Sequence, residues 1–583
     1  MDIYSQLRIE KQSRQTCRSN LVYNIICFLN LTFFHSEGKN RYDSIIINGD
    51  LRWQDRLNGL NLPFFLASDS FFTNYTWPNT FPSLSASFLV ELDASLMQGK
   101  GKSLHDIFVG IDVWGRGSHG GGGFGSYRAI EHIEPESMGL SVALFGPAWT
   151  WESEESKNGW SWEKWWQYER TLWIGRPQEG EKVDVPDYPR RRGEPPCTHG
   201  EFKPISSFFP DMDPPDPAIL PFFTSFCPGA GYSWFVGGKR VLHKKNGWTD
   251  VDKQTSLGNC LWPKPNVNWE DIIIDENLPQ TSVSLSFLDA FNGSSSVHIQ
   301  LSGSGTSIKE GSFRCFWIPV QSLTVSSNTI YEAQIVYKAS CDTGEIDLAL
   351  SAKSVDSEKS ITITPVAESI TGCLSNGWSK ATIHFQNIPS TSDSNVDYSA
   401  PIPIQLGLVI GSAFEDPSEI YNIDVQLGQA TVFPARLPAH SPFESRLLWV
   451  DCSPICSSLA TLCITWETCV SFTTPAKLGT VDPEAPLLPW QLDRSPLWAP
   501  KYMYFNVYMQ RRDVNDGGSM PSEGLLFIGT SGTDGMDRQF IIDRSSLPED
   551  LRCGPVRFYI QGLTDRGLVT PWEHCAYVDF DFS

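Results

Sequence analysis

The sequence has little positive charge and no long hydrophobic run. Its 583 residues include 45 Lys and Arg against 67 Asp and Glu, a net charge of −22 at pH 7. Nucleic acids and anionic membranes attract basic surfaces, so this excess of acid argues against both as partners. Residues 21–34 are apolar but interrupted by two Asn, and they are shorter than the roughly 20 residues that span a bilayer. We therefore expect neither a nucleic-acid-binding nor a membrane protein.

Cysteine spacing typical of zinc sites is also absent. The 14 Cys are spread over the chain without the paired CxxC pattern, and the group between residues 452 and 469 has no His within it. No signal peptide with a small-residue cleavage site is evident near the N-terminus. Reduced thiols are the rule in the cytosol. We therefore expect free thiols in a cytosolic protein, no metal ligands and no cofactor.

Strand-like and helix-like segments alternate between residues 41 and 265. Residues 107–113 and 140–145 are short apolar runs typical of buried strands. Strands that alternate with helices predict right-handed crossovers and a parallel sheet. Residues 176–217, rich in Pro, Arg and Asp, predict an irregular surface insertion. The predicted helices cover residues 50–61, 83–97, 127–133 and 160–172.

After residue 265 the pattern changes to short alternating strands separated by Ser, Gly and Asn turns. This pattern predicts a β-sandwich over residues 266–438 and a second, fibronectin-III-like β-sandwich over residues 439–583. Residues 1–40 show no clear period and join abruptly to the segment that begins at residue 41. The predicted fold class is therefore α/β followed by all-β.

Four blocks between residues 41 and 152 mostly follow or contain an apolar run and end in aromatic rings, carboxylates or amides. Strands of a (β/α)8 barrel end in this way at the face that carries the active site. Aromatic rings pack on the apolar faces of sugars, and fixed polar groups bond their hydroxyls, so the mixture favours a carbohydrate site. The alternative is that these rings only cover the barrel rim. The residues are Tyr42, Asp43, Asn74, Trp77, Asp112, Trp114, Trp149, Trp151 and Glu152.

A glycine-rich run over residues 115–125 follows the predicted strand 107–113 and precedes a helix. Phosphate-binding loops occur in this position, but they end in Gly-Lys-Ser/Thr, which this run lacks. We interpret the run as a flexible loop at the mouth of a barrel.

The order and spacing of the blocks resemble glycoside hydrolase family 85, the endo-β-N-acetylglucosaminidases. The matching residues are Tyr42-Asp43-Ser44, Trp53-Gln54, Phe71 to Trp77, Gly110 to Gly117 and Ala143 to Glu152. Arg41 and Ser70 depart from the family pattern, which has Trp and Gly there. The resemblance implies the C-terminal half of a (β/α)8 TIM barrel within residues 41–265, followed by the two β-sandwiches. Residues 220–222 look like the last barrel strand, and residues 1–40 would lie outside the family in an N-terminally incomplete chain.

The resemblance implies hydrolysis of the bond between the two N-acetylglucosamines of an N-glycan core. In such substrate-assisted retaining catalysis the 2-acetamido oxygen attacks the anomeric carbon, an Asn orients that amide, and a Glu two residues later acts as acid and base. The family carries this Asn-x-Glu upstream of the strand that contains Tyr42, where this chain has none. Asn268-Trp269-Glu270 is its sole Asn-x-Glu and stands in the wrong context. We therefore predict no catalytic residue and an inactive chain.

The resemblance assigns substrate contacts residue by residue. Tyr42 would contact the reacting sugar, Trp53 and Trp77 would line the glycan cleft, and Asp112 and Glu152 are polar candidates at its rim. The expected partner is an N-glycan or free oligosaccharide. A non-catalytic glycan-binding protein that uses the same aromatic residues is the alternative, and a secreted adhesion protein built from β-sandwiches is a third hypothesis.

Overall fold

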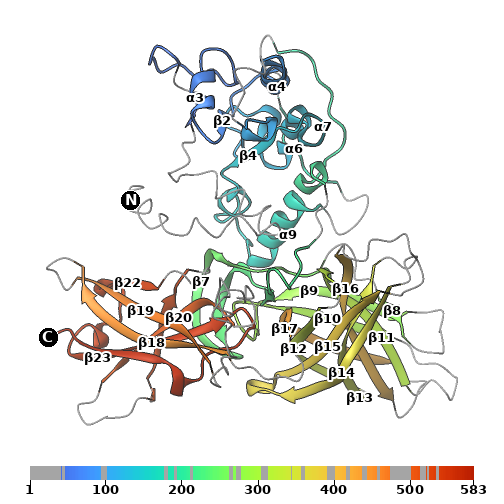
Figure 1. The fold of residues 1–583 in the computed structure, drawn as a ribbon, viewed down its shortest axis with the longest axis vertical. Helices are drawn as coiled ribbons and strands as arrows, with labels where there is room; N and C mark the ends of the chain where they lie inside the picture. Colours follow the sequence, from blue (N-terminus) through green and yellow to red (C-terminus); the bar gives the residue numbers. More distant parts are fainter. Residues whose placement is uncertain are drawn as a thin grey trace, which may run out of the picture. The chain divides into compact units, whose positions relative to one another are not determined.

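Figure 1 shows the computed structural model of the chain, which divides into two compact units. Unit 1 is Met1–Met212 and unit 2 is Asp213–Ser583, and each is described by itself. The expected N-terminal segment, residues 1–40, lies outside the described residues, as does part of the predicted insertion. The structure describes residues 41–42, 46–92, 101–175, 182–188, 194–210, 214–261, 267–270, 278–303, 313–327, 329–342, 344–355, 361–389, 401–414, 420–435, 443–455, 460–472, 500–512, 520–521, 524–532 and 538–583.

Unit 1 is organised around a four-stranded parallel sheet. The strands are adjacent in chain order, β1-β2-β3-β4, and each neighbouring pair is parallel. Parallel sheets are covered on both faces, which agrees with the nearly complete burial of β3. The strands are β1 (Arg41–Tyr42), β2 (Phe71–Thr73), β3 (Ile107–Asp112) and β4 (Ser141–Phe145).

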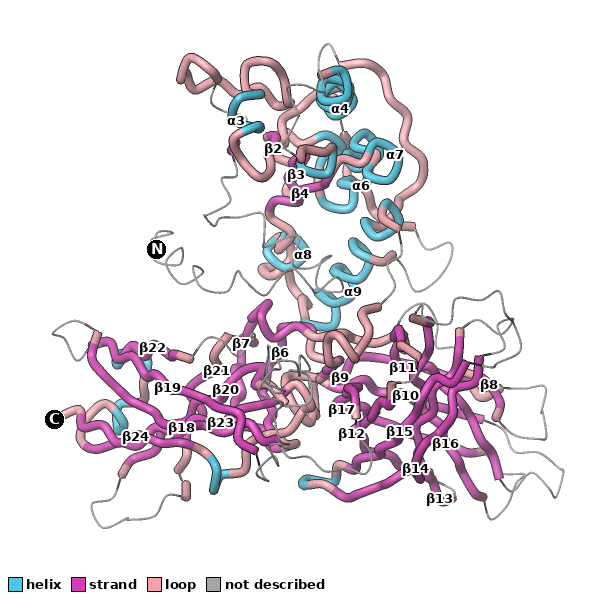
Figure 2. Tube along the Cα trace, viewed as in Figure 1, coloured by secondary structure: helices cyan, strands magenta, loops and turns pink. Residues whose placement is uncertain are grey.

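Helices connect these strands and share one hydrophobic core with them. Phe71 of β2, Ile111 of β3 and Ile130 of α6 are fully buried in that core. Among the described residues all α-helices belong to unit 1, and the short helical segments of unit 2 in Figure 2 are 3-10 turns. They are α3 (Leu62–Leu66), α4 (Phe81–Glu91), α6 (Ser126–Ile133), α7 (Pro135–Met138), α8 (Trp149–Glu152) and α9 (Trp162–Trp173), with 3-10 turns η3 (Leu104–Asp106), η4 (His119–Gly121), η5 (Gly123–Gly125) and η6 (Ile205–Phe208).

The helix predicted over residues 50–61 is wrong, because this segment forms turns. Asp55 has a φ of 54°, a left-handed conformation that ends any right-handed helix. The Asn61 side chain accepts from the Asn58 N–H and donates to the Arg56 carbonyl, at 2.8 and 2.9 Å. Such side-chain to backbone bonds compete with helix formation, which explains the failure of the apolar pattern here.

Unit 2 begins with strands that form two antiparallel sheets and a hairpin. One sheet has the order β14-β15-β12-β17-β10-β9 with β5 also on β17, and the other has the order β13-β16-β11-β8. Strands β6 and β7 pair with each other. The bounds are β5 (Phe222–Thr224), β6 (Pro228–Val236), β7 (Lys239–Gln254), β8 (Asn268–Trp269), β9 (Gln280–Ser286), β10 (Ser296–Gly303), β11 (Phe313–Val325), β12 (Ile330–Cys341), β13 (Gly344–Ser354), β14 (Ile361–Cys373), η8 (Ser375–Gly377), β15 (Ser379–Pro389), β16 (Ile402–Phe414) and β17 (Tyr421–Pro434).

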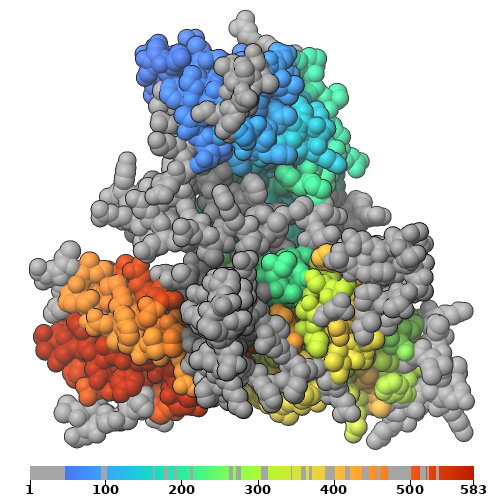
Figure 3. All heavy atoms as spheres, in the orientation of Figure 1, coloured from blue at the N-terminus to red at the C-terminus, as the bar shows by residue number. Residues whose placement is uncertain are grey.

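The remaining strands of unit 2 form two further sheets around one core. The orders are β18-β19-β22 and β21-β20-β23-β24. Trp466 of β19, Phe505 of β20 and Phe558 of β23 are buried together between them, and these strands (orange to red) pack as one body in Figure 3. The bounds are β18 (Phe443–Pro454), β19 (Thr461–Phe472), β20 (Tyr502–Arg511), β21 (Leu526–Thr530), β22 (Gln539–Asp543), η10 (Arg544–Ser546), η11 (Glu549–Leu551), β23 (Pro555–Thr564), η12 (Trp572–His574) and β24 (Ala576–Asp581).

The segment predicted as the last barrel strand lies in unit 2 instead. Thr224 of β5 pairs with Ala430 of β17 in an antiparallel register. The predicted boundary at residue 265 also differs from the division at residue 212, because β6 and β7 pack within unit 2. Trp234 of β6 lies 5.9 Å from Tyr504, ring centroid to ring centroid. A short apolar run identifies a strand but not its partner, which explains the difference.

Asp216 anchors the chain where it enters unit 2. Its carboxylate is 4% exposed and accepts hydrogen bonds from the hydroxyls of Tyr331, at 2.8 Å, and Ser326. The Ala218 N–H also donates to it, at 2.7 Å. These bonds compensate the burial of the carboxylate and fix the chain six residues before β5.

Candidate functional site

The carboxyl ends of β2, β3 and β4 meet at one edge of the parallel sheet, with Arg116 among them. Asp112, the last residue of β3, pairs with Phe145, the last residue of β4. The Arg116 guanidinium lies 5.5 Å from the centroid of the Phe145 ring, and the Tyr75 ring stacks on the same Phe145 ring at 5.9 Å. We call Tyr75, Asp112, Trp114, Arg116, Phe145 and Glu152 the strand-end cluster.

A buried carboxylate holds Arg116 in place. The Asp112 side chain is fully buried and bonds the Arg116 Nε at 2.8 Å and Nη2 at 3.2 Å. The backbone N–H groups of Trp114 and Arg116 donate to the same carboxylate. The hydrogen bond that Arg116 donates to Asp112 is the main cause that raises the pKa of Arg116, with smaller contributions from the charges of Asp112, Tyr75 and Glu152. The result is a fixed cation whose side chain is 60% exposed.

Trp114 adds a partly exposed aromatic residue two positions before Arg116 in the sequence. Its side chain is 38% exposed. Gly146 has a φ of 68°, and a Cβ there would lie 2.8 Å from the Trp114 ring, so only glycine allows this close approach. A fixed guanidinium next to exposed aromatic surface can bond hydroxyl or amide oxygens of a sugar while its ring face packs on the indole.

The structure places Tyr42, Trp53 and Asn74 near the amino-terminal strands. Tyr42 pairs with Phe72 across β1 and β2, but its side chain lies outside the description. Trp53 is 53% exposed on the turns before α3. Asn74 donates to the Asp55 carboxylate at 3.0 Å and to the Thr76 hydroxyl at 2.6 Å. Asn74 thereby ties the segment that carries Trp53 to the end of β2.

Trp77 and Trp149 pack into the core of unit 1. Trp77 is fully buried, and its Nε1 donates to the Gly110 carbonyl of β3 at 2.7 Å. The Trp149 ring meets Phe124 edge-on at 5.3 Å. A sugar therefore has no access to the Trp77 ring in this structure, contrary to the expectation that this ring lines the cleft.

Trp151 and Glu152 belong to different surroundings although they are neighbours in sequence. The Trp151 Nε1 donates to Glu155 at 2.7 Å, and its ring lies 6.0 Å from the ring of Trp160. Glu152 is exposed and interacts electrostatically with Arg116. Of the predicted residues, the structure therefore brings Asp112 and Glu152 together around Arg116, while Trp151 joins an aromatic group on α8 and α9.

Sequence reasoning missed Tyr75, Arg116 and Phe145 as members of the site. Arg116 stands four residues after Asp112, a spacing at which a turn can bring a base onto an acid, and this signal was available. Tyr75 and Phe145 lie inside the blocks that resemble the family pattern, but nothing in the sequence shows that their rings stack on each other.

The only Asn-x-Glu of the sequence, residues 268–270, lies in and next to a short strand of unit 2. Asn268 and Trp269 form the short strand β8, and Trp269 packs on Phe316 of β11 at 4.8 Å. Glu270 forms an ion pair with Lys353. These contacts tie the motif to the sheet that contains β11 and β13.

A second group of polar side chains lies behind Trp77. His119 of η4 stacks on Trp77, with ring centroids 6.1 Å apart. His132, Cys197 and His199 lie around it, and the four residues present ligand atoms within 4.8 Å of one another. Burial, together with the neighbouring His132, lowers the pKa of His119 to about 4, so the imidazole is neutral at pH 7.

Comparison with known proteins finds a family model that is similar to part of this chain. The model of glycosyl hydrolase family 85 matches residues 12–234. This match includes residues 12–40, which we expected to lie outside the family. Residues 12–234 of the chain are thus similar to glycosyl hydrolase family 85.

The curated relatives share one name. The chain is 37% identical over 236 residues to cytosolic endo-beta-N-acetylglucosaminidase 2 of Arabidopsis thaliana, which covers 40% of this chain and 26% of that protein. It is 40% identical over 117 residues to cytosolic endo-beta-N-acetylglucosaminidase of Homo sapiens, covering 20% and 14%. The matched region thus spans about a quarter or less of these relatives.

One solved structure is weakly similar to this chain. The glycoside hydrolase domain of Endo-D from Streptococcus pneumoniae R6 is 14% identical, with a TM-score of 0.47, and covers 93% of this chain and 68% of that chain. Its TM-score and sequence identity are both low. Among the described helices of this chain, none has the length and apolar character to cross a membrane.

Proposed function

We propose that this protein acts on N-glycans, with the strand-end cluster as a binding site for the N-acetylglucosamine core. The observation that carries the proposal is the Arg116 guanidinium, held by the buried Asp112 and lying 5.5 Å from the centroid of the Phe145 ring. A fixed donor beside an aromatic ring suits a sugar that carries both hydroxyls and an acetamido carbonyl. The endo-beta-N-acetylglucosaminidase name of the relatives supports this substrate class.

The proposed architecture is the carboxyl-terminal half of a (β/α)8 barrel with two β-sandwiches. Four parallel strands in sequential order support the first part, since barrel strands follow one another in this way. Facing antiparallel sheets with a common core, as in β18 to β24, support the second. We propose a cytosolic location because the relatives carry that word in their names.

For the family, we propose substrate-assisted retaining hydrolysis of the GlcNAc-β1,4-GlcNAc bond. For residues 1–583 of this chain, we propose glycan binding without turnover. Hydrolysis needs a carboxyl group that holds a proton near neutral pH and releases it to the leaving oxygen. In the strand-end cluster, Asp112 is committed to Arg116. Glu152 is exposed to solvent and lies within the electrostatic reach of the same cation. Neither has the surroundings of such a group, and no Asn stands two residues before either.

Glycan titration of the purified chain tests this proposal. With a fluorescent chitobiose-core N-glycan we expect measurable binding, and Arg116→Ala and Trp53→Ala should weaken it about tenfold each, or about 1.4 kcal/mol. Trp449→Ala is the matched control, because Trp449 of β18 is 50% exposed against 53% for Trp53. It should leave the affinity unchanged.

Turnover is followed in the same samples by mass spectrometry of the glycan. Binding without cleavage supports the proposal in full. Cleavage by the chain alone would keep the glycan assignment and overturn the proposed lack of turnover. Absence of both binding and cleavage, in a sample whose circular dichroism shows folded protein, would overturn the assignment of the strand-end cluster.

A further inference from the structure

Four side chains of unit 1 form a group with the composition of a zinc site. His119 comes from η4, His132 from the last turn of α6, and Cys197 and His199 from the segment that precedes η6. Each offers one ligand atom, and these atoms all lie within 4.8 Å of one another. Imidazole nitrogen and thiolate sulfur are the ligands that Zn²⁺ prefers in structural sites, four at a time.

The three distances among the ligand atoms of His119, Cys197 and His199 are close to the edges of a tetrahedron around one ion. His119 Nε2 and His199 Nε2 are 3.3 Å apart. The Cys197 Sγ lies 3.2 Å from His199 Nε2 and 3.8 Å from His119 Nε2. Zn–N bonds of about 2.0 Å and a Zn–S bond of about 2.3 Å predict separations of roughly 3.3 Å between nitrogens and 3.6 Å between nitrogen and sulfur.

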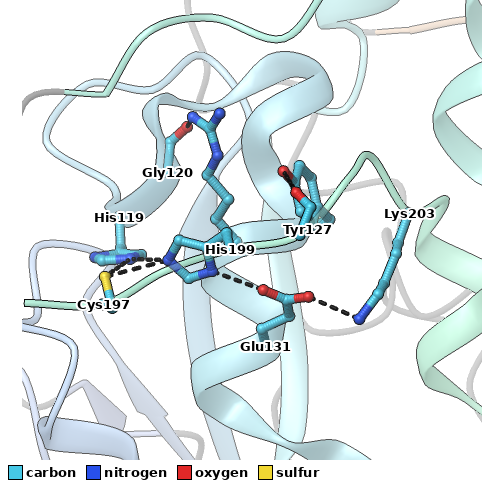
Figure 4. Close-up of polar contacts among 9 residues, drawn as sticks. His119, Gly120, Tyr127, Glu131, Cys197, His199 and Lys203 are labelled. Carbon is cyan, nitrogen blue, oxygen red and sulfur yellow. Dashed lines mark hydrogen bonds and ion pairs between the residues drawn. The ribbon is translucent and has the colours of Figure 1, made fainter. Parts of the chain in front are cut away.

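The outer nitrogens of two imidazoles bond carboxylates, as zinc-bound histidines do. His119 Nδ1 lies 3.0 Å from Glu194, and both side chains are buried. His199 Nδ1 lies 2.6 Å from Glu131, which also pairs with Lys203 (Figure 4). These carboxylates orient the two rings so that Nε2 of each faces the centre of the group.

When Nδ1 of each ring donates to its carboxylate, the Nε2 lone pairs of His119 and His199 face each other across 3.3 Å. Two acceptors at this distance repel unless a proton or a cation lies between them. One thiol hydrogen on Cys197 can satisfy only one of the two. Within the described part of the chain, His132 Nε2 is also buried without a hydrogen-bond partner. A cation at the centre would compensate all of these groups at once.

We propose that His119, His132, Cys197 and His199 bind one Zn²⁺ ion in a structural site. The charges also agree, because the ion, the Cys197 thiolate, the two carboxylates and the Lys203 ammonium sum to zero. All four positions are taken by protein, so no position is open for a water or a substrate. The site would fix the segment 194–200 against η4 and α6, where the Tyr127 hydroxyl already donates to the Gly200 carbonyl at 2.9 Å.

Metal analysis of the full chain, purified without a histidine tag, tests the proposal. We expect about one zinc per chain, since structural sites bind tightly. Cys197→Ser and His132→Ala should reduce the zinc content at least tenfold. Cys373→Ser and His105→Ala are the matched controls, because both residues are exposed and lie outside the group. These controls should retain the metal.

Cobalt substitution and chelation keep the test decisive if a variant fails to fold. Wild-type chain stripped with a chelator and reloaded with Co²⁺ should show visible bands of tetrahedral cobalt and a sulfur-to-cobalt charge-transfer band. Chelation should lower the thermal midpoint, and added Zn²⁺ should restore it. Less than about a tenth of a zinc per chain, without a cobalt spectrum and without a response to Zn²⁺, would overturn the site. The assay uses no glycan, so its outcome is independent of the proposed function.

Discussion

Trp77 illustrates how a residue of a signature block can serve the core. The block that contains it resembles the glycosidase pattern, yet its indole is fully buried and bonds the Gly110 carbonyl. Trp53, from a neighbouring block, is half exposed. Both residues have the same side chain, so sequence pattern alone could not separate packing from contact. Whether a Trp side chain points into the core or to solvent depends on the local backbone conformation, and only the structure shows that conformation.

Replacement of Trp77 should destabilise unit 1. We expect Trp77→Ala to lower the free energy of unfolding by about 3–5 kcal/mol, because it removes a buried indole and leaves a cavity. Trp77→Phe should cost about 1–3 kcal/mol through the loss of the hydrogen bond to the Gly110 carbonyl. Urea unfolding followed by near-ultraviolet circular dichroism measures both.

Trp53→Ala provides the control for this prediction. Since Trp53 is exposed, its removal should change stability by less than about 0.5 kcal/mol while it weakens glycan binding. A Trp77→Ala chain with wild-type stability and lost glycan affinity would contradict the buried position of Trp77.

At the scale of elements, apolar runs predicted strands well and turns poorly. The strands expected at 107–113 and 140–145 correspond to β3 and β4 within one residue at each end. The helices expected at 127–133 and 160–172 correspond to α6 and α9 within two residues at each end. The helix expected at 50–61 failed because Asn side chains bond the backbone there. Local hydrogen bonds of this kind leave no periodic signal.

The parallel sheet depends on a glycine where β2 and β3 approach closely. A Cβ on Gly110 would lie 2.7 Å from the Thr73 carbonyl oxygen and 2.8 Å from the Phe72 ring. We expect Gly110→Ala to destabilise unit 1 by about 1–3 kcal/mol, because the strand must shift. Thermal unfolding monitored by circular dichroism provides the measurement.

Gly59→Ala is the matched control for Gly110. A Cβ on Gly59 would meet no described atom within 4 Å, and its φ is not positive. Its substitution should change the midpoint little. Equal effects of the two substitutions would show that β2 and β3 do not approach as the structure has them.

The four proposed zinc ligands could not be recognised from their positions in the chain. Positions 119 and 132 lie in a glycine loop and a helix, and 197 and 199 follow a Pro- and Arg-rich stretch. No known ligand spacing covers this arrangement. The fold brings them together through α6 and the segment before η6, so the cluster follows from tertiary structure alone.

At the scale of the whole molecule, the division between the units differs from the boundary expected at residue 265. Strands β5 to β7 precede that boundary but pack within unit 2, where Lys253 of β7 donates to the Ser531 carbonyl at 2.6 Å. Composition changes near 265, whereas packing changes near 212. The boundary predicted from the sequence followed the change in composition, because composition does not show which strands pair with each other.

Two fragments distinguish these boundaries. The fragment 214–583 should fold cooperatively, because it keeps β5 on β17 and Trp234 against Tyr504. The fragment 266–583 should be less stable by several kcal/mol or aggregate, since it exposes the Tyr504 environment. Size-exclusion chromatography and urea unfolding compare them. A 266–583 fragment as stable as 214–583 would contradict the division at residue 212.

The Asp216 carboxylate has a mechanical consequence. A pull transmitted along the chain from residue 210 reaches Asp216 before it reaches β5. The hydroxyls of Tyr331 and Ser326 would therefore bear the tension first, while the three backbone pairs between β5 and β17 remain slack. Tension on the chain would thus be taken up at Asp216 before it loads the backbone pairs between β5 and β17.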